Sequence, residues 1–132
     1  MGDIGSEYYE YNFVQEDWNV SAPDLYPWIG EISKDVEAKY GYPLNSFFAQ
    51  GYTAAMVAIQ ALEDAGSTAP PDILKALKEM DIQMSDPDQR IIMTGYPRIK
   101  FDENGQNTYS TETIIQYQKG QPVAFSPAEA FR

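Results

Sequence analysis

The sequence of 132 residues contains no histidine and no cysteine. It therefore offers no thiolate nucleophile, no disulfide bond and no serine–histidine relay. It also lacks the two side chains that hold most zinc and copper sites, so that a metal would need oxygen ligands. Nucleophile-elbow and glycine-rich phosphate-loop motifs are absent as well. We therefore expect no enzymatic activity, no metal site and no cofactor.

Basic residues are also few, with 9 Lys and Arg against 20 Asp and Glu, for a net charge of −11. This charge repels phosphate backbones and anionic lipids, which excludes nucleic acid and membrane surfaces as expected partners. The longest apolar runs fall far short of the 18 residues of a membrane span. Acidic residues recur through the first thirty positions, where an export signal needs a basic start and an apolar middle, so we expect no targeting segment within this chain.

The chain is rich in apolar residues, at 43%, and in aromatic residues, at 14%. This composition, together with the length, predicts one folded domain or a substantial piece of a larger one. Capping residues and apolar spacing predict three helices: one over residues 21–40, one over 46–65, and one that starts within residues 67–72 and runs to about residue 80. Gly41 and Gly66 stand where a left-handed residue ends a helix, and Pro27 suggests that the first helix begins near Trp28 after an initial turn.

The faces of the second and third helices follow from their apolar spacing. The second helix is rich in alanine and almost uncharged, so we expect it to be central and buried on more than one side. Its predicted inner stripe consists of Phe48, Tyr52, Ala55, Met56, Ile59 and Leu62. The third helix is expected to bury Ile73, Leu74, Leu77 and Met80.

Strands are predicted before and after these helices. Residues 8–14 combine aromatic residues with valine, which is typical of a strand or an extended crossing segment. Asn104 and Gly105 favour a tight turn between strands at 98–101 and 109–118, and a last short strand follows at 122–125. A calcium loop is the alternative for residues 102–107, but Thr113 occupies the twelfth position, where such a loop needs Glu. The aromatic cluster at 8–13 could be either a stacking wall for an organic ligand or ordinary packing.

Six segments in a fixed order resemble a known family. The resemblance covers roughly residues 20–127, and its motifs are 39–43 (KYGYP), 49–54 (AQGYTA), 61–68 (ALEDAGST), 72–77 (DILKAL), 99–107 (IKFDENGQN) and 115–120 (IQYQKG). Together they resemble the C-terminal part of the type I periplasmic solute-binding proteins, which deliver branched-chain amino acids and related solutes to ABC transporters. Thr53 departs from the family pattern, which usually has Asp there, and residues 81–95 are longer and more polar than the pattern.

The resemblance implies an α/β fold class: part of a periplasmic-binding-protein type I fold, with three helices, a C-terminal β-hairpin and short strands in an incomplete lobe. Residues 1–20 would be a crossing or hinge segment with a short strand. Residues 21–95 would form the helical part of one lobe, and residues 96–132 the C-terminal hairpin and closing strands. The missing remainder would explain why three helices precede strands without an alternating βαβ pattern.

The same resemblance implies a C-terminal fragment of the substrate-capture component of an ABC importer. The parent would be periplasmic or lipid-anchored outside the cell, and its partners would be a small amino-acid-like solute, the remainder of the receptor and the ABC permease. The residues expected to line the ligand cleft are Tyr9, Tyr11, Gln50 and Tyr52, with structural packing as the competing interpretation for each. The alternative function is a small stand-alone α/β interaction or sensory domain. In both cases we expect exposed apolar surface and self-association.

Overall fold

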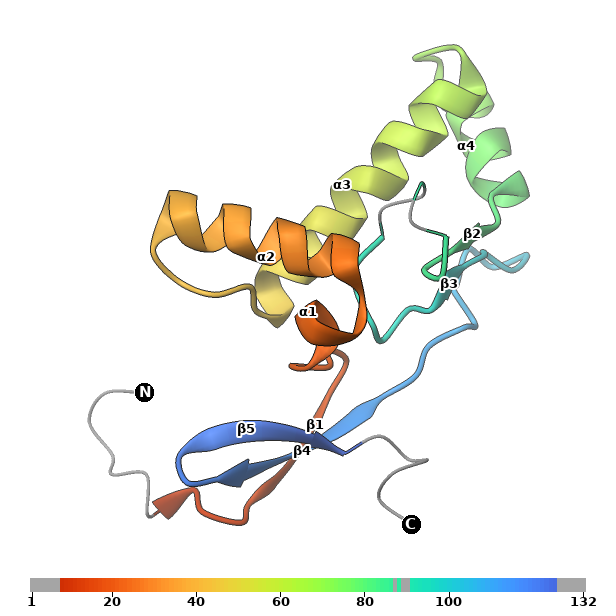
Figure 1. Cartoon of the computed structure of the whole chain (residues 1–132). Helices are drawn as coiled ribbons and strands as arrows, with labels where there is room; N and C mark the ends of the chain where they lie inside the picture. The colour runs from red at the N-terminus through yellow and green to blue at the C-terminus, as the bar shows by residue number, and fades with distance from the viewer. Residues whose placement is uncertain (1–7, 87, 89–90, 126–132) are drawn as a thin grey trace.

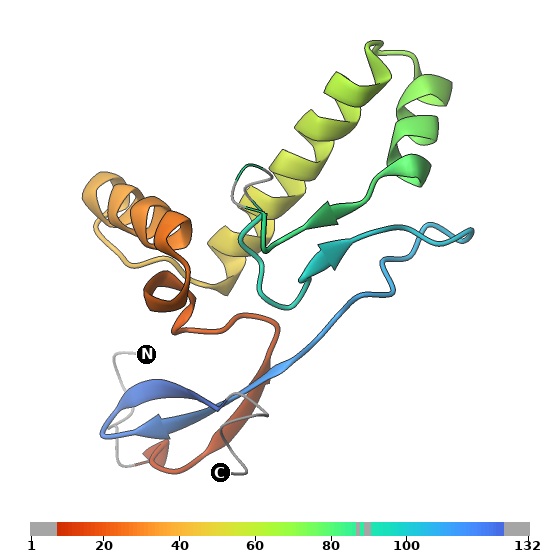
Figure 2. The same cartoon turned by 45° about the vertical axis from the view of Figure 1, so that its right-hand side comes forward.

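The computed structural model describes residues 8–86, 88 and 91–125. Two parts are visible in Figures 1 and 2: a helical part with a two-stranded ribbon, and a separate three-stranded sheet. The elements are, in chain order, β1 (Phe13–Glu16), α1 (Ala22–Leu25), α2 (Pro27–Tyr40), α3 (Ser46–Ala65), α4 (Pro70–Glu79), β2 (Ile82–Gln83), β3 (Arg98–Ile99), β4 (Thr113–Gln118) and β5 (Gln121–Phe125).

The helix predicted over residues 21–40 is divided into α1 and α2. The break falls at Tyr26, whose backbone is extended with φ −124° and ψ 108°. The cause is Pro27, because a proline ring disfavours the helical region for the residue before it. The predicted end is confirmed: Gly41 is left-handed with φ 76°, and its N–H donates to the carbonyl of Glu37.

The predicted bounds of α3 are confirmed, and the helix contributes to both core clusters, but its predicted burial on more than one side is wrong. The side chain of Asn45 caps the helix by accepting from Phe48 N, and Gly66 ends it with φ 56°. The buried residues along the helix are Ala49, Thr53 and Ala61. Ile59 and Leu62 of the predicted stripe remain 47% and 43% exposed, because the described elements cover only one side of α3.

The inner face of α4 is confirmed in part. Met80 is buried, and Ile73 and Leu77 pack against the same core cluster. Leu74, predicted to face inward, is instead 54% exposed, whereas Ala76 is buried. Positions 73, 76, 77 and 80 share a helical face, and position 74 is rotated away from that face by about 100°.

The core of the helical part consists of two clusters joined by a short irregular segment. One cluster lies around α1, α2 and the first half of α3, and the other around the second half of α3, α4, β2 and β3. Ile92 and Met93 belong to the first cluster and Ile91 to the second. All three side chains are fully buried, so this segment, which forms neither helix nor strand, lies at the centre of the core.

The turn predicted around Asn104 and Gly105 is confirmed, but the strand pairing predicted on either side of it is wrong. Gly105 has φ 79°, and the side chain of Asp102 accepts hydrogen bonds from the N–H groups of Asn104 and Gln106. Past this turn the pairing is a single bridge between Phe101 and Asn107. β3 pairs with β2 instead, and the chain leaves the ribbon to begin β4 at Thr113.

The separate sheet has the order β1-β4-β5, with both pairs antiparallel. Its first strand begins later than predicted, because residues 9–11 form a turn in which Tyr11 has φ 63°. The final strand and its turn are confirmed, and Lys119 and Gly120 both have positive φ, as in the two-residue turns that match strand twist. β1 and β4 lead into the two connections between the sheet and the helical part (Figure 2). Within the described residues, helices are too short or too polar to span a bilayer.

Candidate functional site

A cavity of about 510 Å³ lies between α3, the segment after Met93, β3 and the turn that follows β3. Its walls are mostly apolar, including Val57, Tyr96 and Phe101. Its polar lining residues are Gln50, Thr53, Gln106 and Asn107. Ligand sites in proteins typically have this size and this mixture of apolar wall and few polar groups. The cavity is therefore the first candidate site on the helical part.

The spacing of residues along α3 places one wall of this cavity. Gln50, Thr53 and Val57 follow one another at three- and four-residue intervals and so share a helical face. The cap at Asn45 fixes where this face begins, since the first helical N–H groups need a partner outside the helix. A shift in the helix start would rotate these side chains out of the wall.

Thr53 joins the α3 wall to the buried segment behind it. Its side chain is 4% exposed, and its hydroxyl oxygen accepts from the backbone N–H of Ile92 at 3.2 Å and of Met93 at 3.0 Å. Both N–H groups lie in the core, where an unpaired donor costs free energy. An aspartate, usual in the family that the sequence resembles, would offer acceptors at the same place. Threonine offers the acceptor without burying a charge.

A second junction holds the segment after Met93 against the chain that leaves β1. The N–H of Asn19 donates to the hydroxyl of Thr94 at 2.6 Å. Gly95 lies so close that an added Cβ would be 2.5 Å from the carbonyl oxygen of Asp17. Gln50 reaches the same place, since its amide donates to a carboxylate oxygen of Asp17 at 3.3 Å. The cavity wall and the connection from the sheet are thus fixed to each other.

The four residues predicted to bind a ligand do not come together in one cavity. Gln50 lines the main cavity, whereas Tyr52 lines a shallow groove between α2 and α3 and stacks on Phe48 with ring centres 6.5 Å apart. Tyr9 and Tyr11 lie on the separate sheet: the ring of Tyr9 is 6.2 Å from that of Tyr117, and Tyr11 N donates to Tyr117 O. The sequence did not predict that residues 91–96 contribute to a site. Their short apolar run has no periodicity that would indicate which side chains face a cavity.

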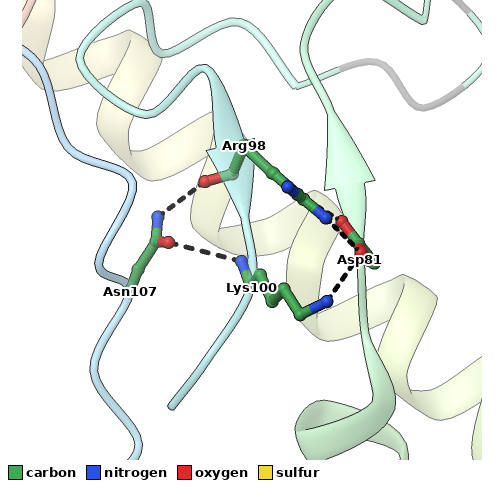
Figure 3. A network of polar contacts seen from close by, with 4 residues as sticks. All are labelled: Asp81, Arg98, Lys100 and Asn107. Carbon is green, nitrogen blue, oxygen red and sulfur yellow. Dashed lines mark hydrogen bonds and ion pairs between the residues drawn. The ribbon is translucent and has the colours of Figure 1, made fainter.

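A charged network joins β3 to Asp81, the residue before β2, and to Asn107, beyond the turn that follows β3 (Figure 3). The guanidinium of Arg98 donates to both carboxylate oxygens of Asp81 at 2.6 Å, and Lys100 Nζ donates to one of them at 3.0 Å. Asn107 bridges the turn to β3, donating to the carbonyl of Arg98 and accepting from Lys100 N. The network thereby positions Asn107 at the cavity rim.

Lowering the pH should weaken this network through Asp81. The hydrogen bonds from Arg98 and Lys100 hold the pKa of the Asp81 carboxyl well below its usual range. A carboxyl with a lowered folded-state pKa contributes stability above its unfolded pKa, and that contribution is lost as the pH falls below about 4. We expect the protection of amides at residues 98–107, relative to their intrinsic exchange rates, to decrease as the pH falls below this value in the wild type. Asp81→Asn should show reduced protection at every pH, and unchanged protection in this variant would contradict the role of the network.

Groups of three or more acidic side chains that could hold a metal ion are absent from residues 8–86, 88 and 91–125. In the turn that was considered as a calcium loop, the Asp102 carboxylate accepts hydrogen bonds from the backbone N–H groups of Asn104 and Gln106. The apolar walls and hydrogen-bonding amides of the main cavity are the mixture that cavities for small organic molecules typically have.

Comparison with known proteins gives two consistent results. Over 129 residues, which is 97% of this chain, the sequence is 30% identical to the Leu/Ile/Val-binding protein homolog 8 of Brucella abortus, and the same figures hold for its counterpart in Brucella suis. The leucine-binding protein LivK of Thermotoga maritima, 21% identical, aligns in structure with 91% of this chain at a TM-score of 0.67. No protein-family model matches. The chain spans 30% of the length of the Brucella proteins and 31% of the Thermotoga protein.

Proposed function

We propose a function on the premise that this chain is a type I periplasmic binding protein in sequence and fold, over about a third of such a protein's length. It forms part of the solute-capturing component of an ABC importer for branched-chain amino acids or related small organic solutes. It binds without catalysing, and it acts with the remainder of the receptor and with the permease. The observation that carries this proposal is the 30% identity across 97% of the chain to proteins named for binding Leu, Ile and Val.

The arrangement of the two parts supports a capture mechanism by closure. β1 and β4 pair side by side, with Val14 opposite Ile115, and lead into the two connections between the sheet and the helical part (Figure 1). Proteins that close around a ligand move two rigid bodies about a few residues at such connections. We propose that residues 1–20 hold one of these connections, 21–95 the body of one lobe, and 96–132 the return to the other lobe.

Gln50 is the residue that this proposal places in contact with solute. It combines a position in the cavity wall with a hydrogen bond to Asp17, on the connection that follows β1. Such a residue can exchange its Asp17 contact for a solute contact when the lobes close. For Tyr9 and Tyr52, the ring contacts support a packing role in this chain. Tyr11 contributes a backbone hydrogen bond to Tyr117, and its side chain is exposed. Their contact with solute would need the remainder of the receptor.

The proposed function also implies a cellular location for the parent protein. Proteins that capture solutes for importers work outside the cytoplasmic membrane, so we place the parent in the periplasm or on a lipid anchor at the cell surface. The absence of cysteine suits an oxidising compartment as well as a reducing one, and the charge of −11 keeps the surface well solvated.

Solute binding should appear as thermal stabilisation of the complete gene product that contains this sequence. A ligand that binds only the folded state adds about 2.7 kcal/mol at a hundred times its Kd, which raises the melting temperature by several degrees. We expect this rise with leucine, isoleucine or valine, or with a related aliphatic or aromatic acid, and none with glucose. No rise with any amino or organic acid would argue against solute capture.

A stand-alone interaction domain is the second candidate, and the exposed aromatic residues of the N-terminal segment favour it. Tyr8 is 71% exposed and Tyr11 68% exposed, and Phe47 on α3 is 84% exposed. Exposed apolar side chains promote association with a partner or a second copy when they gather in a patch. The reading frame that contains this sequence separates the two candidates: an upstream extension with an export signal supports capture, whereas a gene of this length alone supports the interaction domain.

A further inference from the structure

The two connections between the sheet and the helical part are held by the same two residues, Thr94 and Gly95. The first connection runs from β1 to α1, and the second leads from the turn after β3 into β4 (Figure 2). In the first, Asn19 N donates to the Thr94 hydroxyl at 2.6 Å, and this hydroxyl donates to the carbonyl of Asp17 at 3.4 Å. In the second, Thr111 N donates to the carbonyl of Gly95 at 2.8 Å, and the Thr111 hydroxyl donates to the carbonyl of Thr94 at 3.4 Å. Residues 94–95 thus form a shared anchor for both connections.

The first connection is fixed to the helical part from Asp17 onward. The side chain of Trp18 is 3% exposed and belongs to the core cluster that includes Ile29 and Met93. Backbone contact is close as well, since an added Cβ at Gly95 would lie 2.5 Å from the carbonyl oxygen of Asp17. Moving this stretch away from the helical part would expose the indole ring to water and break the hydrogen bonds of the anchor. A rotation of the sheet therefore has to be absorbed before Asp17.

The second connection is fixed to the helical part as far as Thr111. Tyr109 N donates to the side-chain oxygen of Asn107 at 3.3 Å, and the guanidinium of Arg98 lies 4.6 Å from the centre of the Tyr109 ring. Asn107 also donates to the carbonyl of Arg98 at 2.9 Å. These contacts hold residues 107–109 against β3, and the hydrogen bonds of Thr111 extend the attachment to the anchor.

The sheet begins directly beyond these attachments. Glu16, the last residue of β1, pairs with Thr113, the first residue of β4. Only the link between Glu16 and Asp17 and the exposed residue Glu112 therefore lie between the anchor and the sheet. Hinge motions are absorbed by the φ and ψ angles of a few such residues at the ends of elements. A cavity of about 490 Å³, lined by Glu16 on the sheet and Trp18 on the helical part, leaves room for the two parts to move.

We propose that residues 94–95 hold both connections in the open and in the closed receptor, so that closure bends the chain only at the Glu16–Asp17 link and at Glu112. This inference rests on the proposed function and adds where the motion between its two parts occurs. Because one anchor holds both connections, they turn together, and the sheet rotates as one body. Thr94 is a positioning residue, since its hydroxyl acts on the motion through the first connection.

Spin labels on the two parts test the anchor in the complete gene product without solute. The sequence has no cysteine, so that Lys75→Cys on α4 and Gln121→Cys on β5 each introduce one label at an exposed position. Thr94→Val removes the hydroxyl and should broaden the distribution of distances between the labels. Thr94→Ser keeps the hydroxyl and should give the width seen with Thr94 in place. An unchanged width in Thr94→Val would overturn the proposal.

Hydrogen exchange with and without leucine is a second test, and it needs no variant. The amides of Asn19 and Thr111, which donate to the anchor, should keep their protection within about threefold when solute binds. Loss of protection at both amides on binding would mean that the anchor opens during closure, and this result would also overturn the proposal. If the complete protein bound neither branched-chain amino acids nor related organic acids, the proposed function would be contradicted. The distances in the protein without solute would still decide whether the anchor exists.

Discussion

Replacing Thr53 by valine should lower the free energy of unfolding by about 2–4 kcal/mol. Valine matches threonine in shape and in helix propensity, so that the change removes little besides the hydroxyl. The backbone N–H groups of Ile92 and Met93 would then lose the Thr53 hydroxyl, which is their acceptor inside the core. Each unpaired buried donor costs about 1–3 kcal/mol, and urea unfolding of the 132-residue chain measures the sum.

Thr53→Ser is the matched control, because serine keeps the hydroxyl and removes only a methyl group. It should cost about 1 kcal/mol, clearly less than valine. If the valine variant were as stable as the serine variant, the hydroxyl would not be what fixes residues 92–93 to α3. In that case the cavity wall would depend on apolar packing alone.

Replacing Gly95 by alanine should destabilise the chain by about 1–3 kcal/mol, as overpacking of a close contact does. The new Cβ would lie 2.5 Å from the carbonyl oxygen of Asp17 and 2.9 Å from its Cα, and backbone atoms cannot turn aside as a side chain can. We therefore expect the chain after β1 to move away from Gly95. The hydrogen bond from Asn19 N to Thr94, near 2.6 Å, should be lost with it, and amide exchange at Asn19 should accelerate.

Gly51 provides a control for the same substitution. It lies within α3, and an added Cβ would meet no atom within 4 Å. Gly51→Ala should therefore stabilise the chain by about 0.5–1 kcal/mol, since alanine is the better helix former. Equal effects at the two glycines, or a stable Gly95→Ala, would refute the close approach between the segment after Met93 and the connection from β1.

Capping and glycine rules predicted the helix ends well, because each helix end depends on a few neighbouring residues. Gly41 and Gly66 end their helices with left-handed backbones as predicted. The predicted fold class and the family resemblance are also confirmed, since both depended on the order of motifs along the chain. The break at Tyr26 follows a local rule too, because Pro27 disfavours a helical residue before it.

Predictions that depended on distant partners were less successful. Ile59 and Leu62 have the spacing of an inner face, but periodicity cannot tell which side of a helix has a partner within a given chain. Strand pairing failed for a similar reason: the turn at Gly105 was correct, but the sequence beyond it crosses to β1 instead of returning along β3. The site was only partly foreseen, because Thr53 and residues 91–96 meet across about forty positions of sequence.

Calorimetric titration of leucine, isoleucine and valine tests the central claim most directly, when the complete gene product and the isolated 132-residue chain are compared. Capture between two lobes predicts saturable binding at one site per molecule in the complete protein. It also predicts binding that is much weaker or undetectable in the isolated chain, which spans 30% of the length of the relatives that it matches. Equal binding by the two proteins would contradict capture between lobes. If the complete protein bound none of the three amino acids and no related organic acid, solute capture itself would be contradicted.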